Sequence, residues 1–254
     1  MLFSSRPRTR YGKAPVHEVI CQLRFPTILA ISDGDPFAFQ ETIRDEFPQY
    51  ARRQDVPNTS NESRQPVANH HFLSEDGRWR LNLTQDFIAL STLTYPGWEA
   101  FAGRLDRPLA AFIERYRPGN FLRVGLRYVN LFSRMQLGLE NVPWTELIAP
   151  AYTALLREPD VAKDRLLSCG CDLAVRLDSS CQARIHTGLG QVKARGPENN
   201  QDTEQKFILD IDLSMNGSVS GSLAAGALET VHAHAARIFE GVVTNRMREA
   251  MEPL

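Results

Sequence analysis

The sequence predicts an α+β fold in two parts. Residues 1–140 are expected to form a ferredoxin-like split β-α-β half with one extra strand. Residues 141–254 are expected to form an antiparallel-sheet half that packs on the first and ends in a long helix. A length of 254 residues, 43% of them apolar, allows one large domain or two fused small ones. Strand and helix periods alternate along the chain, and residues 224–251 carry one continuous amphipathic stripe.

The first strand and the first helix have recognisable boundaries. Residues 15–26 alternate as a strand does, and Pro26 ends the alternation. Asp35 is a good N-cap, and Pro36 suits the first position of a helix. Apolar residues at i, i+4 and i+8 then predict a helix that buries one stripe of side chains, Phe39, Ile43 and Phe47.

The rest of the first half contains a loop, a sheet and a second helix. Residues 54–69 are polar and lack periodicity, which predicts a mobile loop. Residues 70–96 alternate around an Asp-Gly turn signal, which predicts a meander of three strands. Residues 97–116 have a helical period, and Pro108 is expected to kink this helix or to start a second one. A strand over 121–132 completes the half.

The second half has a similar mixture of elements and no clear internal repeat. Its expected order is a short helix (143–156), two long strands joined at Asp178-Ser179 (165–178 and 180–194), an exposed loop (195–205), a strand (206–215), a flexible turn (217–222) and the C-terminal helix (224–251). The core face of the last strand is expected to consist of four side chains, Phe207, Leu209, Ile211 and Leu213.

Composition indicates a cytoplasmic globular protein. The formal net charge is −1, so no global field attracts nucleic acid or an anionic membrane. The net charge therefore does not indicate nucleic acid as a partner, although it leaves that alternative open. No apolar run approaches the roughly 20 residues of a membrane span. Residues 1–13 are basic but lack the apolar region of a secretory signal, and a mitochondrial presequence is the alternative.

The cysteines and histidines do not form a recognisable metal motif in the sequence. The four cysteines, which are Cys21, Cys169, Cys171 and Cys181, are expected to be reduced. Cys169 and Cys171 lie two apart in a predicted strand and are expected to act as small buried hydrophobes. His232 and His234 diverge by about 200° on a helix, whereas metal-binding helices use i, i+4 spacing. No nucleophile elbow or phosphate loop is present. We therefore expect no catalytic residue, no metal and no cofactor.

The stretch FLRVGLRYVNLF, residues 121–132, is the first candidate site. Its core face is expected to comprise Leu122, Val124, Leu126, Tyr128, Asn130 and Phe132. The other face carries Arg123 and Arg127, about 13 Å apart along the strand, with Gly125 between them. A glycine at this position allows a ligand or another backbone to come close.

Asp210 and Asp212 are the second candidate site, because both project from one face of a strand. Residues 103–134 hold seven arginines against two acids, and residues 198–212 hold five acids against one lysine. Two interpretations remain open. The second half packs on the arginine face, and the two aspartates pair with Arg123 and Arg127 inside the protein. Alternatively, the face is open and the arginines bind phosphate or an acidic partner.

Four motifs carry a resemblance to a known family. They are Y-x-x-A-P-V-x-E-V-x-x-Q-L-R-F at 11–25, R-V-G-L-R-Y-V-N at 123–130, L-D-I-D at 209–212 and V-H-x-H-x-x-R-I-F-E-x-V-V-T-N-R-M-R-E-x-M at 231–251. In this order they resemble a sporadically distributed family of uncharacterised bacterial proteins of about 250 residues. The resemblance implies a bacterial cytosolic protein of the kind found among mobile or defence-associated genes, and it implies no catalytic residue.

Two functions follow as hypotheses. The first is a non-enzymatic binding or regulatory protein that works with a protein partner in phage defence or a toxin–antitoxin pair. The second is a metal-dependent enzyme or binder that acts on a phosphorylated or nucleic-acid substrate, with Arg123 and Arg127 holding phosphate and Asp210 and Asp212 holding a divalent ion. The C-terminal helix is also a candidate homodimer contact, because its apolar stripe is wide.

Overall fold

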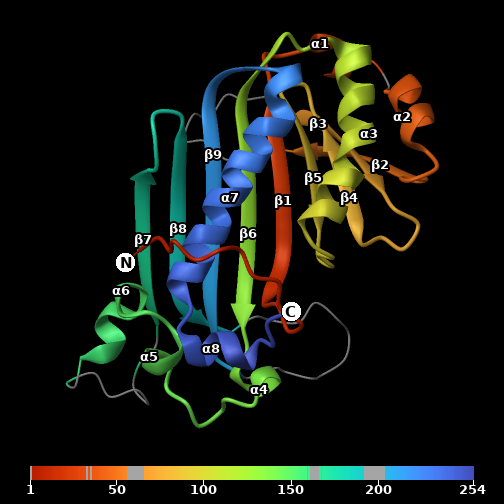
Figure 1. Ribbon diagram of the computed structural model, residues 1–254. Helices are drawn as coiled ribbons and strands as arrows, with labels where there is room; N and C mark the ends of the chain where they lie inside the picture. The colour runs from red at the N-terminus through yellow and green to blue at the C-terminus, as the bar shows by residue number, and fades with distance from the viewer. Residues whose placement is uncertain are drawn as a thin grey trace. The chain divides into compact units, whose positions relative to one another are not determined.

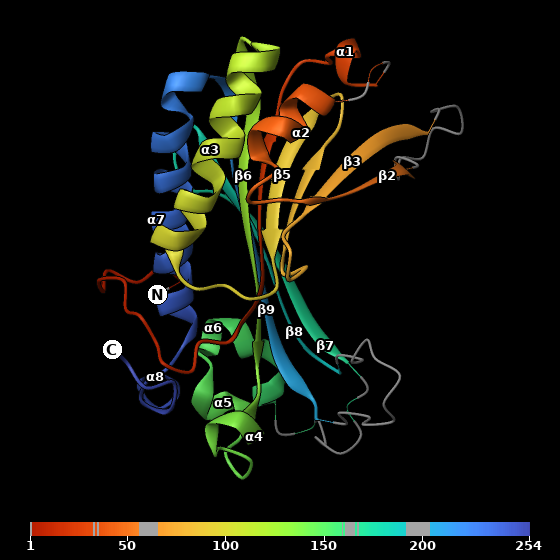
Figure 2. The ribbon, with the colours of Figure 1, turned by 90° about the vertical axis from the view of Figure 1, so that its right-hand side faces the viewer.

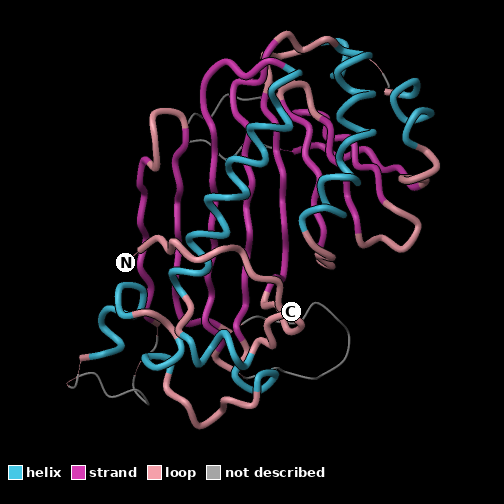
Figure 3. The backbone as a smooth tube through the Cα atoms, viewed as in Figure 1, coloured by secondary structure: helices cyan, strands magenta, loops and turns pink. Residues whose placement is uncertain are grey.

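The computed structural model is a mixed α/β protein built around one large antiparallel sheet of nine strands (Figures 1 and 3). It describes all residues except 1, 33, 35, 56–65, 159, 161–165, 167 and 192–203. The strands are hydrogen-bonded in the order β2-β3-β4-β5-β1-β6-β9-β8-β7. Within the described residues, no helix has both the length and the apolar character that crossing a membrane requires.

The chain forms two compact units that are interleaved in sequence. Unit 1 comprises residues 1–17, 127–213 and 230–254, and unit 2 comprises residues 18–126 and 214–229. The predicted halves, 1–140 and 141–254, are continuous in sequence, whereas these units are not. The ferredoxin-like description stays a prediction.

Unit 2 contains most of β1 (Val16–Arg24), the meander and three helices. The strands are β2 (Gln49–Asp55), β3 (Val67–Leu73), β4 (Trp79–Leu83) and β5 (Phe87–Thr92), and the helices are α1 (Leu29–Ser32), α2 (Phe37–Ile43) and α3 (Trp98–Tyr116). Antiparallel pairing of β3 with β4 and of β4 with β5 confirms the predicted meander. Helices α2 and α3 lie on one face of these strands (Figure 2). The Phe39 ring centroid lies 5.5 Å from that of Phe72, and Phe112 lies 4.7 Å from Phe25.

Several predictions about unit 2 are wrong in detail. Residues 49–55 form β2, which pairs with β3 although it buries no side chain, so no apolar alternation marks it. The expected loop 54–69 therefore begins and ends inside strands, and its residues 56–65 lie outside the described part of the chain, as does the expected N-cap Asp35. Pro108 lies inside one helix, α3, and starts no second helix.

Strand β6 (Asn120–Phe132) keeps the predicted alternation except at its start. Leu122 was expected in the core but is 51% exposed, whereas Phe121 is fully buried. The Phe121 ring centroid lies 6.3 Å from that of Phe112 on α3, so the larger ring occupies the buried position. From Val124 onward the predicted core side chains are buried, including Asn130, whose Nδ2 donates to the Leu209 carbonyl oxygen at 3.1 Å.

Unit 1 contains the remaining part of β6, three more strands and a set of helices. The strands are β7 (Cys169–Arg176), β8 (Cys181–Gly190) and β9 (Lys206–Ser220), and the helical segments are α4 (Arg134–Leu137), α5 (Trp144–Leu147), α6 (Pro150–Thr153), η1 (Ala154–Arg157), α7 (Ala224–Val242) and α8 (Asn245–Ala250). Strands β7 and β8 pair around the predicted Asp178-Ser179 junction. Helices α5, α6 and the unit 1 part of α7 lie on one face of these strands (Figure 2). We call the opposite face the outer face.

The core face of β9 is as predicted, because Phe207, Leu209, Ile211 and Leu213 are all buried. Three boundaries differ from the prediction. The expected turn 217–222 belongs mostly to β9, which continues to Ser220 and is followed by η3 (Gly221–Leu223). The expected helix 143–156 is divided into α5, α6 and η1. The C-terminal helix ends at Val242, and α8 restarts after Thr244, whose Oγ1 accepts from the Met247 backbone N–H at 3.4 Å.

Candidate functional site

A groove of about 360 Å³ on the outer face of unit 1 holds three of the predicted site residues. Strands β6, β9, β8 and β7 supply its side chains, and its lining comprises Arg127, Asp172, Leu173, Ala174, Arg184, Ile185, His186, Asp210 and Asp212. The register places Asp172 opposite His186 and Ala174 opposite Arg184, so these four side chains share one face. Leu173 and Ile185, which pair with each other, alternate with these residues along the two strands.

Arg127 and Asp210 form a two-pronged ion pair in this groove. Arg127 Nε and Nη2 donate to Asp210 Oδ1 at 2.8 Å and to Oδ2 at 2.5 Å. The Arg127 side chain is 46% exposed and that of Asp210 is 19% exposed. The aspartate therefore fixes the direction of the guanidinium while leaving it accessible. An ion pair as open as this one stabilises the fold by at most about 1 kcal/mol.

The second arginine of the groove has a different environment. Arg184 is exposed, and within the described part of the chain its guanidinium has no hydrogen-bonded or ionic partner. Nearby, His186 Nδ1 lies 2.8 Å from Asp172 Oδ1. With His186 neutral, the two arginines and three aspartates of the groove give a formal charge of 2 − 3 = −1. The groove thus presents both signs of charge. Among the described residues, none occupies the Arg184 guanidinium, which is available to a ligand.

The other two predicted site residues, Arg123 and Gly125, belong to unit 2. A Cβ added to Gly125 would lie 2.2 Å from Arg123 Nη1, so the arginine folds over its own neighbour. Arg123 Nη1 also donates to Gln22 Oε1 at 3.4 Å. The space that Gly125 opens is therefore filled by the Arg123 guanidinium.

Sequence reasoning missed Arg184, Asp172 and His186. The two strands that carry them were predicted, but their register was not. Antiparallel pairing with the turn at Asp178-Ser179 would have placed Asp172 near His186, and this turn was the one available signal. The position of β9 beside β8 could not be read from the chain, because 15 residues separate the end of β8 from the start of β9.

The structure brings together a second group of polar residues at the turn between β7 and β8. The donor atoms of Asp178, Cys181 and His234 all lie within 4.8 Å of one another, and these three residues could hold a metal ion. Sequence reasoning described Cys181 only as a reduced thiol, and it predicted that His232 and His234 point in different directions from the helix. The separation is confirmed: His232 Nδ1 lies 2.8 Å from the Tyr128 hydroxyl, whereas His234 Nε2 lies 3.3 Å from Asp178 Oδ2.

Hydrogen bonds and burial set the pKa values of two members of this group in opposite directions. Backbone N–H groups of Ser180 and Cys181 donate to Asp178 Oδ1 at 2.8 and 2.7 Å and lower the pKa of its carboxyl. Burial raises the pKa of the Cys181 thiol, and the Asp178 carboxylate raises it further. Without a cation, Cys181 is thus held as a thiol next to an ionised aspartate.

No protein-family model matches the chain, and no curated protein matches it.

Proposed function

We propose that this chain is a non-enzymatic binding protein that recognises a partner polypeptide in the groove on the outer face of unit 1. The observation that carries the proposal is the arrangement of charge in that groove. Arg127 is oriented by Asp210, Arg184 is exposed, and three aspartates stand on the same surface. A surface with both signs of charge complements a polypeptide segment that also carries both, and such complementarity selects partners and orientation.

The finer parts of the proposal have separate grounds in the sequence. The order of the predicted elements supports a ferredoxin-like first half, and the wide apolar stripe of the C-terminal helix supports a homodimer. The resemblance to uncharacterised bacterial proteins supports a cytoplasmic location and a role beside a partner protein in phage defence or a toxin–antitoxin pair.

Charge reversal in the groove tests the proposal. Wild-type protein, Arg184→Glu and Arg127→Glu are immobilised and exposed to native-host lysate that has been treated with nuclease. Arg24→Glu, an exposed arginine on β1 in unit 2, is the matched control. We expect a protein that wild type and Arg24→Glu retain equally and that both groove variants lose. Thermal melting of each variant checks that its fold is intact.

Two results would overturn the proposal. One is a retained protein that binds all four forms equally, which would place its contact elsewhere. The other is retention that depends on nucleic acid, seen as material that is captured from untreated lysate and is entirely absent when the lysate has been treated with nuclease.

The alternative function uses the same groove for a phosphorylated or nucleic-acid substrate. The observation in its favour is that Arg184 joins Arg127 in the groove, which supplies two guanidinium groups for phosphate oxygens. Arg123 stands in unit 2 and is not part of this arrangement. Binding of a phosphorylated oligonucleotide that is stimulated by Mg²⁺ or Mn²⁺, and that Asp210→Asn removes, would favour this alternative.

A further inference from the structure

The turn between β7 and β8 presents a carboxylate whose orientation is fixed. Asp178 Oδ1 accepts three hydrogen bonds, from the Ser180 and Cys181 backbone N–H groups and from Ser180 Oγ at 3.0 Å. These bonds leave Oδ2 to face His234 on α7. Donors that orient a ligating carboxylate are typical of the surroundings of protein metal sites.

The other two donor atoms converge on the same point from different parts of unit 1. His234 Nε2 lies 3.3 Å from Asp178 Oδ2. Two ligand atoms about 2.1 Å from one tetrahedral ion lie about 3.4 Å apart, so this spacing already fits. The Cys181 sulfur lies within 4.8 Å of one carboxylate oxygen of Asp178 and of one ring nitrogen of His234. A tetrahedral zinc site needs about 3.6 Å between sulfur and nitrogen, so the sulfur must move by at most about 1.2 Å.

The donor set determines which ion fits. One sulfur, one imidazole nitrogen and one carboxylate oxygen suit Zn²⁺ and do not suit Mg²⁺ or Ca²⁺, which prefer oxygen ligands. Thiolate and carboxylate together carry a charge of −2, which neutralises the ion. Cys181 is 1% exposed, so its sulfur is shielded from solvent.

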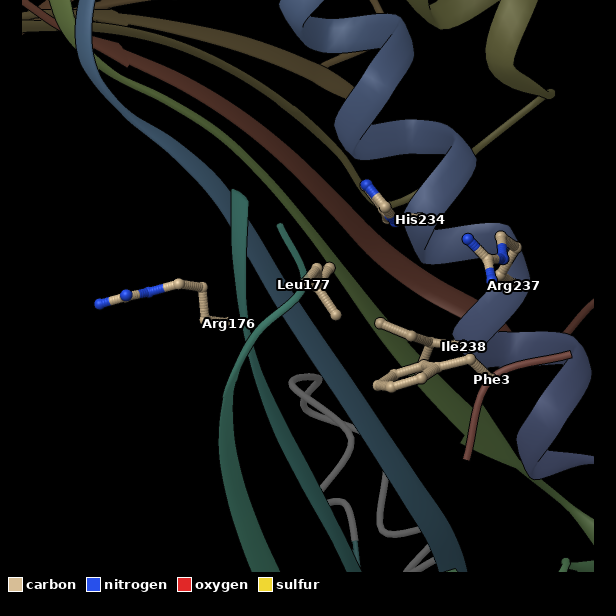
Figure 4. A pocket seen from close by; sticks show the side chains of 6 residues that line it. All are labelled: Phe3, Arg176, Leu177, His234, Arg237 and Ile238. Carbon is tan, nitrogen blue, oxygen red and sulfur yellow. The ribbon is translucent and has the colours of Figure 1, made fainter. Parts of the chain in front are cut away.

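A small cavity adjoins one member of the group, His234, and has room for water. It has a volume of about 110 Å³ and is lined by Phe3, Arg176, Leu177, His234, Arg237 and Ile238 (Figure 4). Leu177 directly precedes Asp178, and His234 belongs to both the cavity and the group. A volume of this size holds a few water molecules at about 30 Å³ each. Three protein ligands plus one water is a common zinc arrangement.

We propose that Asp178, Cys181 and His234 form a binding site for Zn²⁺, with a water molecule in the cavity as the fourth ligand. On binding, the thiol releases one proton to solvent and coordinates as thiolate. The neutral imidazole keeps its single proton on Nδ1 and coordinates through Nε2. The site lies on α7 and the β7–β8 turn, so it is independent of the groove proposed to bind a partner.

Metal titration of the full, tag-free chain tests the site. We expect one Zn²⁺ per chain after dialysis, measured by elemental mass spectrometry, and a higher melting temperature with ZnCl₂ but not with MgCl₂. CoCl₂ in place of zinc should produce a thiolate-to-cobalt charge-transfer band. Cys181→Ser should abolish that band, and His234→Gln should weaken zinc binding at least tenfold.

Two matched variants control for surface binding. Cys171→Ser removes an exposed thiol, and His186→Gln removes an exposed imidazole outside the group. Both should bind zinc as wild type does. The proposal is overturned if wild type takes up no stoichiometric zinc, if the cobalt complex lacks a thiolate band, or if the controls lose zinc as His234→Gln does. Because Cys181→Ser is a buried substitution, its melting curve without metal is recorded, and His234→Gln decides the outcome if Cys181→Ser is unfolded.

Discussion

At the scale of single residues, burial and neighbouring charge decide the chemistry of the titratable groups. His71 on β3 is 8% exposed, and its ring lies 3.3 Å from Asn82 Nδ2. Burial lowers the pKa of His71, and the charges of Arg53 and Arg80 lower it further, while Asp55 opposes them. His70, the next residue, lies within hydrogen-bonding distance of the Tyr50 hydroxyl and the Ile31 carbonyl. Two adjacent histidines thus occupy different surroundings.

The lowered pKa of His71 predicts a loss of stability at acid pH. The pKa of the folded state lies below the unfolded value of about 6.5, so the unfolded chain binds an extra proton as the pH falls through that range. The free energy of unfolding should therefore decrease between pH 7.5 and pH 5.5. His71→Gln should reduce this decrease, as measured by denaturant unfolding at both pH values. The prediction fails if wild type and His71→Gln have the same pH dependence, or if His186→Gln, a substitution of an exposed histidine, reduces the loss as much as His71→Gln does.

The cysteines should differ sharply in reactivity. Burial raises the pKa of Cys21 to about 12, although the charge of Arg123 acts against this rise. Cys171 was expected to be buried but is exposed on β7, and Cys169 is only partly buried, so that prediction is wrong. A thiol-specific chromogenic reagent should modify Cys171 quickly and Cys21 only after unfolding, because the thiolate is the reactive form. Removal of the fast phase by Cys171→Ser would identify its source, and a fast phase that survives this substitution would contradict the assignment.

At the scale of elements, α7 is held to its sheet by aromatic packing. The Phe239 ring centroid lies 5.9 Å from that of Phe132 on β6 and 5.9 Å from that of Tyr11 in the N-terminal segment. Phe132 is fully buried, whereas Phe239 is only partly buried. Tyr11 also donates to Glu240 Oε1 at 2.8 Å, so the same region of α7 receives a polar contact. The helix therefore combines an apolar stripe with one buried carboxylate.

This packing predicts different costs for two truncations. Phe132→Ala should decrease the free energy of unfolding by about 3–5 kcal/mol, as expected for a fully buried ring. Phe239→Ala should cost less, about 1–3 kcal/mol, because part of its ring stays in contact with solvent. Urea unfolding of both variants measures the difference. Equal losses, or a loss under about 1 kcal/mol for Phe132→Ala, would show that this contact does not hold the helix.

At the scale of the whole molecule, four elements link the two compact units. Strands β1, β6 and β9 and helix α7 each pass from one unit into the other, with the changes at 17–18, 126–127, 213–214 and 229–230. Helix α7 is continuous over 19 residues through its change of unit. Unfolding of one unit would break hydrogen bonds inside elements that the other unit shares. The two units are thus coupled through covalently continuous secondary structure.

This coupling predicts a single cooperative unfolding transition. Trp144 reports on unit 1, and Trp79 and Trp98 report on unit 2. Trp144→Phe and the double variant Trp79→Phe/Trp98→Phe allow each unit to be followed by fluorescence. In each variant, we expect tryptophan fluorescence and circular dichroism to give the same denaturant midpoint. A fluorescence midpoint that differs from the circular-dichroism midpoint of the same variant would show that the units unfold independently.

The sequence alone determined most of the elements, because their signals are local. The stripe of Phe39 and Ile43, the meander after residue 67 and the core face of β9 follow from periodicity within a few residues. Strand β2 carried no such signal, because its exposed side chains leave no alternation to detect. The break before α8 was also missed, because the apolar stripe continues across Thr244.

Only the tertiary structure decided which polar residues meet. The sequence nominated Arg127 and Asp210 from opposite charge blocks, and they do pair, because β6 and β9 are neighbours in the sheet. Their position beside Arg184, and the convergence of Cys181 with His234 from a turn and a helix, depend on strand order and helix placement. Such contacts join residues far apart in the chain. They arise from burying apolar faces elsewhere in the molecule, so no local pattern around the polar residues themselves encodes them.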